Sequence, residues 1–199
     1  MDARTKLGHR MNGDGFTRDK IVEFLSELER RLAERGVALD IQIVGGAALL
    51  LHGLLDRVTE DIDAKYQSTA VVDEVVDAMA EDYNLPKKWL NSRAAAFLPD
   101  NVRWMAYPEG LSSAVKLADL PTLAAMKVAA ERDKDIIDLG YLVNAMGITD
   151  PAELVDLAYE KYGEDSIPLS QGRLNYEIVA EEAIAAARRF KQQNREDDA

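Results

Sequence analysis

Apolar residues recur along the chain at two spacings, which distinguish helices from strands. Over residues 17–36 they fall three or four positions apart and share one face of a predicted helix. The run at 41–44 indicates a short strand that ends at Gly45-Gly46, and 47–52 indicates a short buried helix. Over 61–66 the apolar period becomes two, which is typical of a strand.

The rest of the chain indicates more helices and two more strands. The predicted elements are helices over 69–82 and 85–97, strands at 102–107 and 112–117, a helix from 119 to about 146, a helix starting at 150–151, and an amphipathic helix over 174–191. This order predicts an α/β (α+β) fold, with a mixed sheet core flanked by helices at 17–119 and a helical C-terminal region at 120–193 packed on it. Segments 1–16 and 194–199 are predicted to be a flexible leader and a loose tail.

Composition excludes several classes of protein. The chain has no cysteine, so disulfides and thiolate metal sites are excluded. Its 36 acidic and 24 basic residues give a net charge of -12, which argues against non-specific DNA binding because a phosphate backbone is repelled. No apolar run approaches the roughly 18 residues of a membrane span, and the polar start does not resemble a secretory signal. We therefore expect no membrane partner and a cytoplasmic location.

Asp61 and Asp63 are the first candidates for chemistry. In a strand, residues i and i+2 point to the same side, so the two carboxylates would stand next to each other. Adjacent like charges are unfavourable unless a cation such as Mg²⁺ or Mn²⁺ binds them, and Mg²⁺ prefers carboxylate oxygens together with substrate phosphates. The pair therefore predicts a metal site that holds a nucleoside triphosphate (NTP). The alternative is a pair of solvated acids on a strand edge.

Gly45 and Gly46 let the backbone approach a ligand closely because they have no side chains. Their N–H groups and the following helix are suited to hold a phosphate. Arg57 and Thr59, which lead into the acidic strand, are candidates to contact the same anion. A Gly-Gly pair alone is usually only a turn, but the order of phosphate turn, short helix and acidic strand favours a nucleotide site.

The stretch VGGAALLLHGLLDRVTEDID, at 44–63, resembles the signature of the nucleotidyltransferase superfamily. It is most similar to the branch that contains the AbiEii- and MenT-type toxins, whose later Lys and Arg-x-x-Asp segment resembles AMKVAAERDKDIIDL at 125–139. The resemblance spans about 17–147 and implies a nucleotidyltransferase-like fold. It also implies Mg²⁺-dependent transfer of a nucleoside monophosphate from an NTP to tRNA, another RNA end or a protein, and a cognate antitoxin if the chain is a toxin.

Two positions depart from that signature. Ala47 stands where many active members have Ser or Thr, and the predicted strands at 102–107 and 112–117 carry no third carboxylate. Glu109 lies in the turn between these strands, and Asp119 lies beyond them. The departures favour an alternative, a non-catalytic module of the same fold that binds a nucleotide or a protein partner. Retention of both strand acids favours an enzyme.

Charged side chains share one face of the helix predicted over 119–146, if that helix is continuous. They are Lys127, Glu131, Lys134 and Asp138. One interpretation is an exposed ladder of ion pairs. The other places Lys127 on the triphosphate, with Asp135 or Asp138 orienting it or completing the metal site. The resemblance favours the second interpretation, so Lys127 and Asp138 are predicted to be catalytic together with the acidic pair.

Positive charge and both tryptophans gather in one region of this acidic chain. The residues are Lys87, Lys88, Trp89, Arg93, Arg103 and Trp104. The tryptophans are either core residues with solvated neighbours or part of an acceptor groove in which bases stack on indole. The two histidines, His9 and His52, are too sparse for a metal site, and His52 is expected to be buried or half-buried on its helix.

Overall fold

The computed structural model of the chain describes residues 15–107 and 110–197. Pro108 and Glu109 of the predicted turn, most of the predicted leader with His9, and the last two residues lie outside the described residues. The sheet has five strands in the order β3-β2-β1-β5-β4. They are β1 (Ile41–Ile43), β2 (Ile62–Tyr66), β3 (Leu90–Asn91), β4 (Trp104–Ala106) and β5 (Val115–Ala118).

The sheet is mixed, as the sequence predicts. Strand β1 pairs antiparallel with β2 and parallel with β5, while β2 pairs parallel with β3 and β4 antiparallel with β5. Seven α-helices accompany it in the described part of the chain. They are α1 (Arg18–Glu34), α2 (Gly45–Leu51), α3 (Ala70–Tyr83), α4 (Leu120–Ala130), α5 (Asp133–Met146), α6 (Pro151–Tyr162) and α7 (Arg173–Asp197), with 3-10 turns η1 (Arg93–Phe97) and η2 (Ile167–Leu169). The α/β fold with a helical C-terminal half is confirmed.

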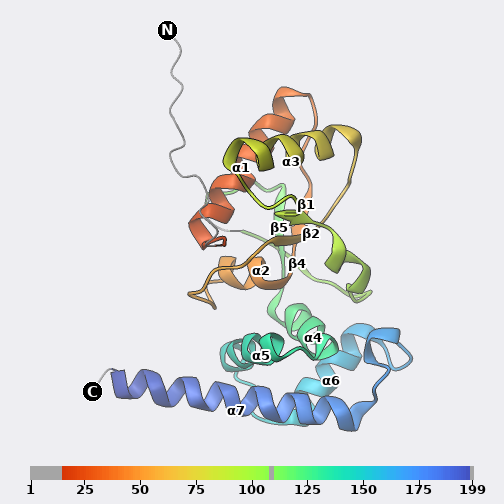
Figure 1. Cartoon of the computed structure of the whole chain (residues 1–199). Helices are drawn as coiled ribbons and strands as arrows, with labels where there is room; N and C mark the ends of the chain where they lie inside the picture. Colours follow the sequence, from red (N-terminus) through yellow and green to blue (C-terminus); the bar gives the residue numbers. More distant parts are fainter. Residues whose placement is uncertain (1–14, 108–109, 198–199) are drawn as a thin grey trace.

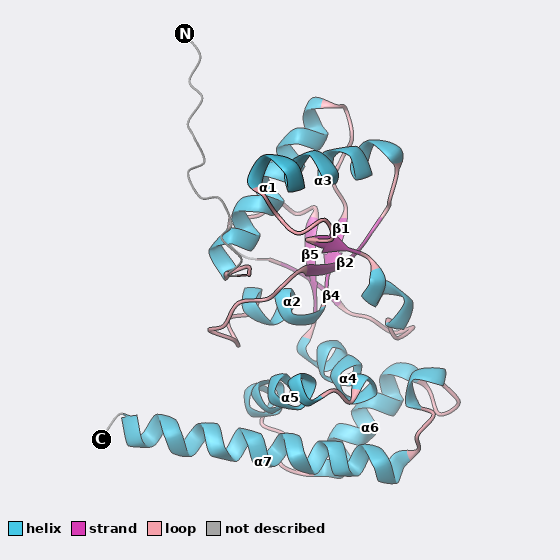
Figure 2. Cartoon of the chain, viewed as in Figure 1, coloured by secondary structure: helices cyan, strands magenta, loops and turns pink. Residues whose placement is uncertain are grey.

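The helices form two groups around the sheet. Figure 1 shows α1 and α3 together on one side, and α4, α5, α6 and α7 packed together beyond α2 on the other. Figure 2 shows that the strands lie entirely in the first group's half of the molecule. Helices α5 and α7 pack closely because Gly140 lies against α7, where an added Cβ would come within 3.0 Å of Ala186. Among the described residues, no helix has the length and apolar character that a membrane crossing requires.

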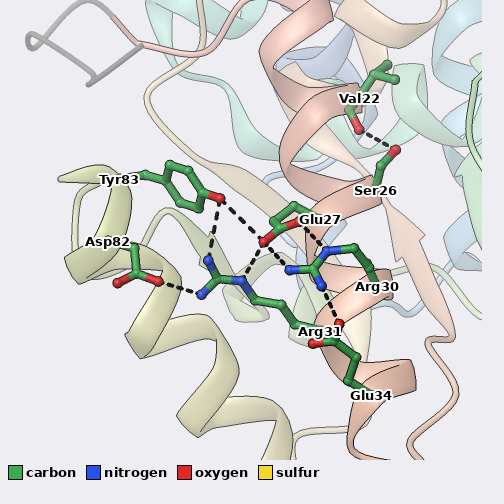
Figure 3. A network of polar contacts seen from close by, with 8 residues as sticks. All are labelled: Val22, Ser26, Glu27, Arg30, Arg31, Glu34, Asp82 and Tyr83. Atoms are coloured by element: carbon green, nitrogen blue, oxygen red, sulfur yellow. Dashed lines mark hydrogen bonds and ion pairs between the residues drawn. The ribbon is translucent and has the colours of Figure 1, made fainter. Parts of the chain in front are cut away.

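Helix α1 forms as its apolar spacing predicts, and it packs on α3. The Thr17 side chain accepts a hydrogen bond from the Lys20 N–H at the start of α1. The apolar face of the helix is buried. On the outer side, polar residues of α1 contact α3 in what we call the surface network (Figure 3). The surface network consists of Glu27, Arg30, Arg31, Glu34, Asp82 and Tyr83.

The helix predicted over 85–97 is wrong. The segment instead forms a turn at Pro86–Trp89, the two-residue strand β3 and the 3-10 turn η1. The backbone carbonyl of Trp89 accepts the Ile62 N–H at 2.7 Å, which joins this segment to the edge of β2. The Trp89 ring is fully buried, and its Nε1 donates to the Val76 carbonyl at 3.1 Å. Pairing with the sheet and burial of the indole therefore outweigh the helical preference of the Ala-rich residues.

The continuous helix predicted over 119–146 is also wrong, because it divides at Glu131. This residue adopts a left-handed backbone conformation with φ of 53°, and α5 starts after Arg132 in an extended conformation. The chain therefore folds back, and α4 and α5 lie side by side. The break moves the charged residues of the predicted ladder onto two different helices.

The ends of the predicted core also shift. Phe16, placed in the leader by sequence, is fully buried and pairs with Thr59 through two backbone hydrogen bonds of 2.6 and 3.0 Å. Helix α7 continues to Asp197, beyond the predicted start of the tail at residue 194. His52 ends α2, is half-buried as expected, and its Nε2 lies 2.9 Å from the carbonyl oxygen of Ala118 at the end of β5.

Candidate functional site

The acidic pair lies at the beginning of β2. Asp61 directly precedes the strand, Asp63 is its second residue, and both are half-buried on either side of the buried Ile62. Burial raises the pKa of Asp63, and the charge of Asp61 raises it further. The expected mutual repulsion of the two carboxylates is therefore present in the folded chain.

The two glycines lie against the residues with which the sequence grouped them. A Cβ at Gly45 would lie 3.1 Å from Asp63 Oδ2, and a Cβ at Gly46 would lie 3.0 Å from Thr59 Oγ1. Gly45 also has φ of 64°, which other residues rarely adopt. Helix α2 starts at Gly45, two residues earlier than predicted, so both glycines are in its first turn, where N–H groups have no partner within the helix.

Thr59 links the glycines to the acidic pair. Its Oγ1 faces Gly46 and donates to the carbonyl oxygen of Asp61 at 3.2 Å. Its backbone is held by the pairing with Phe16. Thr59 is thus fixed beside the start of β2, which agrees with its predicted place between the glycines and the acids.

A chain of ion pairs lies between α4, α5 and the loop before β2, and we call it the buried cluster. It consists of Arg57, Lys127, Arg132, Asp135 and Asp138. The Lys127 Nζ lies 2.5 Å from Asp135 Oδ1 and 2.7 Å from Asp138 Oδ2. Arg57 Nη2 lies 2.5 Å from Asp138 Oδ1, and Arg132 Nε lies 2.5 Å from Asp135 Oδ2. Each of the two carboxylates is therefore bound on both oxygens.

Burial decides between the two interpretations of Lys127. The exposed fractions are 7% for Lys127, 0% for Asp135 and 1% for Asp138, whereas Lys134 is exposed. The exposed ladder is therefore wrong. Burial alone would raise the pKa of Asp135, but hydrogen bonds and charges from Arg132 and Lys127 outweigh it and hold that pKa below its usual value.

The buried cluster lies within electrostatic reach of the acidic pair. The charges of Arg132 and Lys127 act to lower the pKa of Asp63, although burial prevails. The hydrogen bond that Arg132 donates to Asp135 raises the pKa of Arg132, and the charge of Asp63 contributes to the same shift. The structure thus brings together the glycines, Thr59, the acidic pair and Lys127. Arg57 donates to Asp138 Oδ1 at 2.5 Å, and its predicted contact with the same anion as Thr59 stays a prediction.

Sequence reasoning missed two residues of this arrangement. Asn91 of β3 is buried, and its Nδ2 donates to Asp61 Oδ2 at 3.0 Å. No sequence signal marked Asn91, because its segment was assigned to a helix. Arg132 could have been found, since it is the arginine of the Arg-x-x-Asp segment that ends at Asp135. Asp119, considered for a third acid, caps α4 by accepting the Thr122 N–H at 3.0 Å.

The basic and aromatic region agrees with the interpretation in which the tryptophans are core residues with solvated neighbours. Trp89 is completely buried, so it is a core residue and its ring is closed to a base. Trp104 is half-buried and packs against the core. The basic side chains around them are exposed.

The residues at the acidic pair fit a hard divalent cation. Carboxylate oxygens are the ligands that Mg²⁺ and Mn²⁺ prefer, and Asp61 and Asp63 place two carboxyl groups at the start of β2. Across residues 15–107 and 110–197, no group of three or more His, Cys, Asp or Glu side chains is arranged to hold a metal. The acidic pair offers two carboxylates, the donor type that such a cation prefers, and binding of a cation there stays a prediction.

Comparison with known proteins gives one match. Residues 19–161, more than half of the chain, match the family described as nucleotidyltransferase of unknown function (DUF6036). No curated protein and no solved structure matches the chain. The matched residues contain the glycines, the acidic pair and the whole buried cluster, and the chain belongs to this nucleotidyltransferase family.

Proposed function

We propose that the chain transfers a nucleoside monophosphate from an NTP to an acceptor hydroxyl, with Mg²⁺ or Mn²⁺ as cofactor. The observation that carries the proposal is the placement of Asp61 and Asp63 at the beginning of β2, within electrostatic reach of a lysine held by two buried carboxylates. Such a placement combines cation ligands with a fixed positive charge, the two components that phosphoryl transfer needs.

Each group has a separate task in this proposal. Asp61 and Asp63 hold the cation, which neutralises charge on the triphosphate when bound. Gly45 and Gly46 allow the backbone to approach the phosphates beside these acids. Lys127 uses its remaining N–H for a phosphate oxygen, because a protonated amine has three donors and two are bound by Asp135 and Asp138. Asp138 acts by orienting Lys127, since both its oxygens already have partners.

The reaction itself exchanges one phosphorus–oxygen bond for another. The acceptor hydroxyl oxygen forms a bond to the α-phosphorus, and the bond from that phosphorus to the oxygen bridging to the β-phosphate breaks. Pyrophosphate leaves with the electron pair, and the hydroxyl proton passes to water. The positive charges of Lys127 and Arg132 reach Asp63, and they would stabilise the added negative charge.

The identity of the acceptor stays a prediction, as do the toxin role and the cognate antitoxin. RNA ends and protein hydroxyls both satisfy the proposed chemistry. One observation favours the alternative of a nucleotide-binding module without turnover: Ala47 is only 1% exposed and has no hydroxyl to offer a phosphate. The alternative predicts NTP binding without labelled product.

The test combines calorimetry with a labelling assay. The full chain is titrated with each of the four NTPs in Mg²⁺, and then incubated with α-labelled NTP and total RNA or protein. We expect binding and labelled product, both lost in Asp61→Asn/Asp63→Asn. The matched control is Glu23→Gln/Glu60→Gln, which removes two exposed carboxylates and should behave like the unmodified chain. Absence of binding for every NTP, or equal behaviour of the two double variants, would refute the proposal.

A further inference from the structure

Asn91 occupies an unusual position beside the acidic pair. Strand β3 runs parallel to β2, and Asn91 stands directly opposite Asp63 in their register. The residue is buried, with only 7% of its surface exposed. A buried amide must have partners for both its oxygen and its nitrogen, so its contacts show what it does there.

Both ends of the Asn91 amide are bound. The Arg93 backbone N–H donates to Asn91 Oδ1 at 3.1 Å, and Asn91 Nδ2 donates to Asp61 Oδ2 at 3.0 Å. A hydrogen bond from Asn91 also acts to lower the pKa of Asp63, against the effect of burial. A backbone N–H can only donate, which requires the amide oxygen to face Arg93. The NH₂ group must then face Asp61, so the orientation of the amide follows from the chain itself.

We propose that Asn91 is a positioning residue that fixes the Asp61 carboxylate so that Asp61 and Asp63 bind one cation–triphosphate complex. This inference rests on the proposed function. One Asp61 oxygen is held by Asn91, which leaves the other for the cation. The amide is neutral, so it restrains Asp61 without adding a third negative charge to a pair that already repels. Its oxygen is turned toward Arg93, and it therefore supports the cation site without entering it.

A purely structural role is the competing explanation. In that case Asn91 would only close the turn before η1 through its oxygen. Asn91→Asp separates the two roles because it keeps the shape and the oxygen that accepts from Arg93 but loses the donor to Asp61. Asn91→Ala loses both contacts. The double variant Asp61→Asn/Asn91→Asp, which we call the exchange variant, swaps the two side chains. It keeps the bond from the Arg93 N–H, and the amide at position 61 now donates to the carboxylate at position 91.

The experiment measures unfolding temperature and cation binding in the full chain. For Asn91→Asp without divalent cations, we expect an unfolding temperature lower by roughly 3–8 °C, because a hydrogen bond becomes a carboxylate repulsion. The exchange variant should recover most of that loss. Mn²⁺ alone should bind Asn91→Asp at least about tenfold more tightly than the unmodified chain, since a third carboxylate faces the site. Asn91→Ala should bind Mn²⁺ with a non-hydrolysable NTP about five- to tenfold more weakly.

The outcomes separate the two proposals. If the unmodified chain binds Mn²⁺ and NTP but Asn91→Asp matches it in unfolding temperature and Mn²⁺ affinity, the positioning role is overturned and the proposed function stands. If the unmodified chain binds no Mn²⁺–NTP complex, both are overturned. Should Asn91→Asp not fold, the exchange variant decides: recovery of folding supports the contact between Asn91 and Asp61, and failure of the exchange variant to fold contradicts it.

Discussion

The buried cluster and the surface network are built from the same kinds of side chain in different surroundings. In the surface network, Glu27 accepts from both Arg30 and Arg31, and Arg31 also reaches Asp82 at 2.7 Å on α3. In the buried cluster, the side chain of Lys127 is 9% exposed and its two partners at most 2%. The side chains of Arg30 and Asp82 are 54% and 56% exposed. Water therefore screens the charges of Arg30 and Asp82 but is excluded from Lys127, Asp135 and Asp138. The two arginines of the buried cluster, Arg57 and Arg132, are themselves 47% and 61% exposed.

This difference in exposure suggests different roles for the surface network and the buried cluster. Exposed ion pairs contribute about 0–1 kcal/mol, so the surface network fastens α1 to α3 at little cost. Burial of charge costs several kcal/mol per ion, and a packed apolar group would often be as stable or more stable. A buried lysine held by two carboxylates next to a second acidic pair is therefore better explained by chemistry than by stability.

The largest expected effect is the loss of stability caused by Lys127→Met. This change leaves Asp135 and Asp138 buried with fewer partners, so we expect the free energy of unfolding to fall by about 3–5 kcal/mol. Arg31→Met, the matched change in the surface network, should cost about 1 kcal/mol or less. Urea denaturation of both variants measures the two values. Similar losses would remove the distinction between the two groups.

Activity sharpens the same comparison. Where Lys127→Met remains folded, NTP transfer should fall by about 10² or more, because a preorganised charge on the phosphates is lost. Lys134→Ala, an exposed lysine on α5, should retain activity and change stability by no more than about 0.5 kcal/mol. Equal activity of the two variants in the labelling assay would contradict a role for Lys127.

A smaller effect is expected from two glycines, one beside the acidic pair and the other just after α1. Gly45 and Gly36 both have left-handed backbones, with φ of 64° and 72°, so each change to Ala should cost about 1–2 kcal/mol of stability. An added Cβ meets Asp63 Oδ2 at Gly45 but has no atom within 4 Å at Gly36. Gly45→Ala alone should therefore weaken Mg²⁺–NTP binding, by about tenfold on calorimetry. Unchanged binding would show that Gly45 is only a turn residue.

The smallest effect is the pH dependence that Glu27 contributes in the surface network. Hydrogen bonding from Arg30, against the effect of burial and with help from Arg31, lowers the pKa of Glu27 from 4.5 to about 2. The lowered pKa stabilises the folded chain above pH 4.5, and this contribution is lost as the pH falls toward 2. The unfolding free energies of the unmodified chain and Glu27→Gln should therefore differ by about 1 kcal/mol at pH 7 and converge on acidification. Cation–NTP binding by Glu27→Gln at pH 7 should be unchanged.

The sequence predicted those parts of the fold that carry a long apolar period. Helix α1 has five buried apolar positions with regular spacing, whereas β3 has two residues and no period to detect. The Ala-rich residues of η1 favour a helix locally, and only pairing with β2 reveals the strand. The acidic pair and the glycines were found because they are close in sequence. Asn91 was not found because the sheet, and not the sequence, brings it to Asp61.

The division at Glu131 could not be predicted for a related reason. Neither Gly nor Pro interrupts residues 122–139, so sequence gave no stop signal for α4. A non-glycine residue in a left-handed conformation is uncommon, and here the packing of α4 against α5 maintains it. Burial of the charged face followed from that packing, which explains why a ladder and a buried cluster looked alike in sequence.

The connection from β5 to α4 determines where inactivating mutations are expected in the gene. Asp61, Asp63 and Asn91 come before this connection, while Lys127 and its two carboxylates come after it. The two parts of the site are therefore encoded in separate stretches of the gene and meet only when the helices dock beneath the sheet. Alleles that weaken this docking would give the same phenotype as alleles that remove Lys127 or Asp63. Inactivating mutations are accordingly expected at many codons far from those that specify the chemistry.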